Sequence, residues 1–220
     1  MSRLNCYTYG RWIKHATLTT CTLVLLALPG CDLVGGLYGV FIEPLRPKKT
    51  IKAEHSFTDK TVLIWIDQST ASSTHPHLAR HLTVQLAKAL WDNEAGGEIV
   101  NYSRVAKFRP QRPDHNSMSI VELGQAFGAD EVLYLEIRAF AFVHDAGPGY
   151  YQPHVSGIAK VVDVAGGQRI WPADQVATPF SASLKLSEGD GRSVEDRLLG
   201  QLGQKLAEQL APRFYDHKEK

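Results

Sequence analysis

The chain has 220 residues, enough for one domain of about 100–200 residues and additional segments. Apolar residues make up 44% and charged residues 21%, which is typical of a globular protein and excludes a wholly disordered or collagen-like chain. A net charge of +1 gives no support to general polyanion binding, and three cysteines cannot form a disulfide scaffold.

The first thirty residues have the pattern of an export signal. Three basic residues precede an uncharged, mostly apolar run at 18–28, and the first acidic residue is Asp32. This run is shorter than the about 20 residues that span a bilayer, and it suits the apolar region of a secretory signal peptide. The sequence Leu28-Pro29-Gly30-Cys31 resembles the bacterial lipobox, in which the chain is cut before a cysteine that becomes acylated, as with palmitate. We therefore predict a signal peptide at 1–30 and lipidation of Cys31, with an ordinary signal peptide or an N-terminal anchor as the alternatives.

Removal of this leader changes the chemistry of the remaining chain. Three of the 24 basic residues leave with it, so 21 basic residues face 23 acidic ones, and the formal charge becomes −2. Cys6 and Cys21 leave as well, so the mature protein has no free thiol once Cys31 is acylated. Residues 31–58 contain repeated Gly and Pro and no helical period, which predicts a lipid-anchored tether.

The domain is predicted at 59–214, with a charged tail at 215–220. Residues 61–67 form a continuous β-branched and apolar run, which is typical of a strand buried on both faces. Leucines then recur at every fourth position from Leu78, so we expect an amphipathic helix that continues to about Asn93.

The rest of the domain alternates predicted strands and helices. In the strand at 131–142, Ile137 and Ala139 are expected on one face and Phe140 on the other. The order of elements predicts an α/β (α+β) single domain, in which about three helices pack on a mixed sheet of about five strands. The expected elements are a short strand at 98–102, a basic loop at 103–116, a helix over 117–128, strands at 131–142, 154–164, 168–171 and 175–186, and a helix over 193–211.

Three motifs resemble a known group of bacterial envelope lipoproteins. They are the strand at 62–67, the block Gly-Ala-Asp-Glu-Val-Leu-Tyr-Leu-Glu-Ile at 128–137, and Val-Val-Asp-Val-Ala-Gly-Gly-Gln-Arg-Ile-Trp at 161–171. The group has the fold of the TolB N-terminal domain and includes the lipoproteins CsgG, LpoB and PelC. Each motif also has a physical reason. Gly128 suits a left-handed helix end, Asp163 can accept from turn amides, and Trp171 can pack its own hairpin on the sheet.

The resemblance implies a membrane-anchored, non-catalytic scaffold or accessory subunit of a secretion, transport or cell-wall assembly complex. The protein would face the periplasm in the cell envelope, held by the lipidated Cys31, in either the inner or the outer membrane. An envelope protein complex is the expected partner, a homo-oligomer is possible, and neither nucleic acid nor a cofactor is expected. The alternatives are an auxiliary lipid-binding lipoprotein of an ABC-type transporter and a histidine-based metal-binding lipoprotein.

No motif for catalysis is present in the chain. A Gly-x-Ser-x-Gly nucleophile elbow, a Walker motif and a dinucleotide motif are all missing, so we expect no enzymatic activity. His75, His77 and His81 have the spacing His-x-His-x₃-His, and two of them are one helical turn apart, so they are candidate metal ligands. A solvated helix face explains the same pattern.

Two segments are candidate partner-binding sites. The basic loop at 103–116 combines cationic and aromatic side chains, which suit an anionic group or a protein face, although a solvated loop is the alternative. Two tyrosines flanked by Gly and Pro suit an interface because tyrosine offers contact area at low entropic cost, and local packing is the alternative. The candidate residues are Arg104, Lys107, Phe108, Arg109, Tyr150 and Tyr151.

Overall fold

The computed structural model describes residues 49–68, 71, 75, 77–143, 150–185, 187–188 and 192–218. Within the chain, Lys49–Lys220 forms one compact unit. The predicted signal peptide at 1–30, the lipidation of Cys31 and the tether as far as residue 48 lie outside the described residues.

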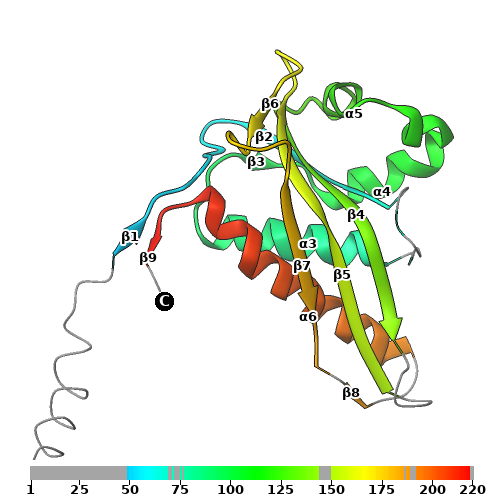
Figure 1. Cartoon of the computed structure of the whole chain (residues 1–220). Coiled ribbons are helices and arrows are strands. Elements are labelled where there is room, and N and C mark those ends of the chain that lie inside the picture. Colours follow the sequence, from blue (N-terminus) through cyan, green and yellow to red (C-terminus); the bar gives the residue numbers. More distant parts are fainter. Residues whose placement is uncertain are drawn as a thin grey trace, which may run out of the picture. The chain divides into compact units, whose positions relative to one another are not determined.

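A mixed sheet forms the centre of the domain (Figure 1). The strands β3, β2 and β4 are parallel neighbours in that order, and β5 pairs antiparallel with β4. The strands β6, β7 and β8 all pair with β5. A separate two-stranded sheet joins β1 to β9, so the first and last described segments lie side by side. The strands are β1 (Thr50–Ile51), β2 (Thr61–Asp67), β3 (Glu98–Ile99), β4 (Glu131–Val143), β5 (Tyr150–Asp163), β6 (Arg169–Trp171), β7 (Thr178–Ser183), β8 (Ser187–Glu188) and β9 (His217–Lys218).

Helices cover both faces of the sheet because β2 is apolar on both sides. Ile64 and its neighbours pack against α3 and α6, whose leucines recur every three or four residues and are buried. Leu63 and Trp65 pack against α4 and α5 on the other face. This arrangement confirms the predicted α+β single domain with a mixed sheet, and it has four α-helices in its described part. They are α3 (Leu78–Asp92), α4 (Tyr102–Gln111), α5 (Ile120–Phe127) and α6 (Arg192–Leu210), with 3₁₀ helices at Pro113–Ser117 and Ala211–Phe214.

The predicted basic loop at 103–116 is wrong, because this segment is mostly helical. The side chain of Asn101 accepts a hydrogen bond of 2.8 Å from the amide of Ser103 and so caps the start of α4. Val105 is buried against the sheet. Pro110 lies near the end of α4, where it removes one helical hydrogen bond, and the helix still continues to Gln111.

The expected facing of β4 is wrong beyond Ile137, because the strand contains a β-bulge. Ile137 pairs with Gly157 and Ala139 pairs with Ser156, so Arg138 is an extra residue on the β4 side. The bulge shifts the alternation by one position. As a result Phe140 joins Ile137 on the core face instead of opposing it.

The domain starts earlier and ends later than predicted. Phe57 is only 1% exposed and stacks on Phe214 at 4.8 Å between ring centroids, so residues 49–58 belong to the fold and not to the tether predicted at 31–58. The segment 215–220, predicted as a charged tail, contributes β9 to the small sheet. The domain boundaries at 59 and 214 are therefore corrected, since backbone pairing and a buried aromatic side chain hold both flanks.

The turn motifs behave as their chemistry predicts. Gly128 ends α5 with φ of 64°, in the left-handed region. The carboxylate of Asp163 accepts from the amide of Gly166 in the turn between β5 and β6. Trp171 is buried in the core beneath the hairpin.

Candidate interaction surfaces

Two of the four candidate residues on α4 are packing residues. The Phe108 ring lies 4.8 Å from Phe127 and 6.5 Å from Trp65, between centroids, so it closes the smaller core. The Arg109 guanidinium lies 4.6 Å above the Trp65 ring, and its Nη2 donates to the carbonyl of Ile66 at 2.6 Å. Of the candidates on α4, only Arg104 and Lys107 are exposed.

Burial sets the electrostatics of Arg109. Desolvation lowers the pKa of its guanidinium, while Tyr102 and Asp67 act in the opposite direction. Its Nε is buried and has no hydrogen-bond partner among the described residues. The side chain thus fastens α4 to the end of β2, and its guanidinium is engaged within the domain.

Asp67 ends β2 at the edge of the sheet where α/β folds often place a functional acid. Its carboxylate accepts a hydrogen bond from the hydroxyl of Tyr134. Burial raises the pKa of Tyr134, and the neighbouring carboxylate of Asp67 raises it further, so the phenol keeps its proton and remains a donor. The pair joins β2 to β4 and therefore has a structural role.

The candidate tyrosines do not join the α4 residues in one surface. Tyr151 is buried, and its ring lies 5.9 Å from Phe142 in an edge-to-face contact. Tyr150 pairs with Glu188 through the backbone, and its side chain lies outside the description. The start of β5 and the helix α4 lie at different places on the sheet (Figure 1). The predicted partner-binding set therefore separates into two groups of residues.

The three candidate metal ligands lie together near the start of α3. The rings of His75 and His77 are 5.8 Å apart, and His81 forms a hydrogen bond of 2.9 Å with Asp196 of α6. The Nε2 of His75 lies 4.0 Å from a carboxylate oxygen of Glu195. Among the residues that the structure describes, however, no group of three or more His, Cys, Asp or Glu side chains is placed to hold a metal ion.

The sequence analysis missed an apolar surface on the outer side of α3. Trp91 is 75% exposed and Val84 is 45% exposed, and with Ile99 and Tyr102 they line an open groove of about 290 Å³. We name these four residues the α3–β3 patch. Val84 and Trp91 are seven positions apart and therefore share one face of α3. That face is exposed, whereas the face that carries the leucines is buried. This second apolar stripe in the sequence could have indicated the patch.

No helix in the described part of the chain is long and apolar enough to span a bilayer. No protein family model matches the chain, and no curated protein sequence matches it. Solved structures of bacterial lipoproteins resemble its fold modestly. The lipoprotein GNA1162 from Neisseria meningitidis has a TM-score of 0.45 at 20% identity, over 69% of this chain and 97% of that one.

Two further solved structures belong to the group that the sequence motifs resemble. PelC from Paraburkholderia phytofirmans, a dodecamer, has a TM-score of 0.39 at 12% identity, over 78% of this chain and 99% of that one. The C-terminal domain of LpoB from Salmonella enterica has a TM-score of 0.37 at 15% identity, over 60% of this chain and 87% of that one. The structures that the fold resembles thus include bacterial lipoproteins of the LpoB and PelC group.

Proposed function

We propose that the chain is a lipid-anchored accessory subunit of a protein complex in the bacterial cell envelope. It faces the periplasm, is fastened through Cys31, and acts by binding a partner protein and not by catalysis. The lipobox-like sequence before Cys31 supports the anchor. The exposure of Trp91 in the α3–β3 patch is the observation that carries the binding role.

The α3–β3 patch has the chemistry of a protein-binding site. A tryptophan indole that is mostly exposed to water is costly, and burial of such a side chain in a partner is a common source of binding free energy. The groove beside it is open and can receive an apolar side chain. β3 is a two-residue strand at the end of the sheet, so no described strand covers its outer side.

A photo-crosslinking amino acid at position 91 tests this proposal in cells that express the full chain. We expect one defined envelope protein to be captured from position 91. The matched control places the same group at Ser181, an exposed residue of β7 that lies outside the patch. In a separate purification without crosslinking, the Trp91→Ala variant should no longer copurify with that partner. The folded fraction of the variant should equal that of the natural chain.

The other outcomes of this experiment decide against the proposal. Equal capture from positions 91 and 181 indicates random collision in the envelope. Capture of lipid alone at position 91 favours the auxiliary lipid-binding subunit of a transporter, because its ligand would occupy the groove.

A further inference from the structure

Exposed apolar side chains occur at a second place in the described part of the chain. Besides Val84 and Trp91, the large apolar side chains that are exposed there are Ile51, Ile170 and Val176. Val176 is 80% exposed and Ile51 is 40% exposed. They belong to β1, β6 and the connection between β6 and β7. Ile170 and Val176 lie in elements at the edge of the main sheet opposite to β3, whereas Ile51 lies in the separate two-stranded sheet.

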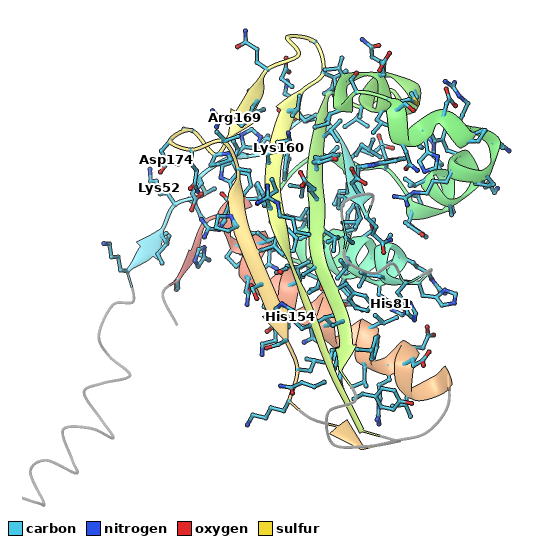
Figure 2. The ribbon with its side chains drawn as sticks, turned by 45° about the vertical axis from the view of Figure 1, so that its right-hand side comes forward. Lys52, His81, His154, Lys160, Arg169 and Asp174 are labelled. Atoms are coloured by element: carbon cyan, nitrogen blue, oxygen red, sulfur yellow. The ribbon has the colours of Figure 1, made fainter. Side chains whose placement is uncertain are left out.

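Hydrogen bonds bring these elements together. Trp171 at the end of β6 donates from Nε1 to the carboxylate of Glu54, three residues after β1, at 2.8 Å. Arg169 donates to the carbonyl of Gln175, beside Val176. Figure 1 and Figure 2 both show the connection between β6 and β7 next to the segment that leads from β1 to β2. Figure 2 shows Lys52, Arg169 and Asp174 at the same end of the molecule.

This end of the molecule is basic. Lys49 and Lys52 flank Ile51, and Lys218 pairs with Thr50 across the small sheet, and all three lysines are exposed. The carboxylate of Glu54 forms an ion pair with Arg213, with 2.7 Å between Oε1 and Nη1. The exposed acids nearby are Asp174 and Asp216, the second of which accepts from the amide of Ala53. A basic surface here contrasts with the chain beyond the leader, where 23 acidic residues exceed 21 basic ones.

The position of the surface along the chain points to its occupant. Residue 49 is eighteen residues after Cys31, a distance of at most about 60 Å for an extended chain. A tether of this length allows any face of the domain to meet the bilayer, so a preferred face must come from the domain itself. The segment nearest to the anchor has the highest effective concentration at the membrane, and it is the one that combines lysines with exposed apolar side chains.

We infer that Lys49, Ile51, Lys52, Val176 and Lys218, which we call the anchor-side patch, contact an anionic phospholipid surface. The inference rests on the proposed lipid anchor. The lysines bind the headgroups, and each contributes about a five-fold increase in membrane affinity. Ile51 and Val176 enter the interface between headgroups and acyl chains. The contact gives the domain a preferred orientation on the bilayer.

Fluorescence quenching on vesicles tests this inference with the full chain. The variants Val176→Cys and Val84→Cys, each with Cys6→Ser and Cys21→Ser, receive one environment-sensitive fluorophore, and Cys31 is kept for the anchor. The vesicles contain phosphatidylethanolamine and phosphatidylglycerol, with a nitroxide on a fraction of the headgroups. We expect quenching and a blue shift of the label at 176, and neither at 84, which is an exposed valine of the α3–β3 patch. Vesicles of phosphatidylcholine should give a weaker signal at 176.

Charge reversal supplies the second measurement. Lys52→Glu with Lys218→Glu should remove the quenching at 176, whereas Lys88→Glu, on α3, should leave it unchanged. Equal quenching at 176 and 84, or none at 176, overturns the inference. A defined partner captured at position 91 together with unquenched 176 would retain the proposed function and reject only the membrane contact.

Discussion

His75 lies beside a pair of aromatic rings that also contact each other, and this position influences its protonation. The centroids of Phe140 and Phe142 are 5.9 and 5.8 Å from the imidazole. Burial lowers the pKa of His75, and the nearby His77 and His81 lower it further, whereas Glu195 and Asp196 raise it, and the net shift is downward. The folded state therefore favours the neutral imidazole.

A dependence of stability on pH follows from this shift. The pKa of His75 is lower in the folded protein than the value of about 6.5 in the unfolded chain, so the unfolded state takes up the proton first as pH falls. The contribution of His75 is full above about pH 6.5 and is lost as pH falls toward its folded pKa. We expect His75→Gln to unfold with a smaller drop in the urea midpoint between pH 7.5 and pH 5 than the natural chain. His154→Gln is the control for loss of a histidine elsewhere in the domain, and an equal drop in all three proteins would contradict the assignment.

The sequence predicted a residue's role where the role depends on neighbours along the chain. Gly128 and Asp163 both act within a few residues of themselves, and the structure confirms both roles. Arg109 was interpreted as a partner-binding cation. Its acceptor is the carbonyl of Ile66, 43 residues away, and no local pattern shows that contact.

The strands β4 and β5 approach each other closely beside the bulge, and this close approach requires Gly157 of β5. A Cβ at this position would lie 2.0 Å from the carbonyl oxygen of Glu136 and 2.8 Å from Cζ of Phe180. Glu136 is paired with Ile158 immediately before the bulge, so its carbonyl cannot move far without disturbing the register between β4 and β5. Glycine is therefore required for close approach of the backbones and not for its φ angle.

Gly157→Ala should destabilise the domain by about 3 kcal/mol or more, because overpacking against a fixed backbone cannot relax. Gly128→Ala is the matched control, since a Cβ there meets nothing within 4 Å but the residue has φ of 64°. It should cost about 1 kcal/mol, the cost of the left-handed conformation alone. Denaturant unfolding of both variants measures the difference. Equal losses would mean that the bulge relaxes easily.

Periodicity predicted the helices α3 and α6 and failed at α4 and beyond the bulge. The leucine stripes report burial directly, because every third or fourth residue faces the sheet. In α4, Val105 is the buried residue, and the helix is held mainly by its cap and by side chains that reach other elements. The shift at Arg138 depends on how β4 pairs with β5, which a single-strand pattern does not contain.

The two flanks of the domain, residues 49–58 and 211–218, bind each other and form what we call the clasp. The backbone amides of Glu54 and His55 both donate to the carbonyl of Arg213. His55 bonds to the buried carboxylate of Glu131 at 2.7 Å. The clasp fastens the segment that would carry the membrane anchor to the end of the domain. Force on the anchor would therefore reach the core through the clasp, and the segment could not act as a free spacer.

The aromatic contact of Phe57 distinguishes a clasp from a spacer. Phe57→Ala removes a side chain that is 1% exposed and stacked on Phe214, so we expect a loss of about 3–5 kcal/mol in the free energy of unfolding. Lys52→Ala, in the same segment but exposed, should change it by less than about 0.5 kcal/mol. A spacer would tolerate both substitutions equally, so equal stability of the two variants would restore the tether interpretation for residues 49–58. Urea unfolding followed by tryptophan fluorescence measures both, because Trp171 lies 5.0 Å from Phe214 and reports on the same end of the core.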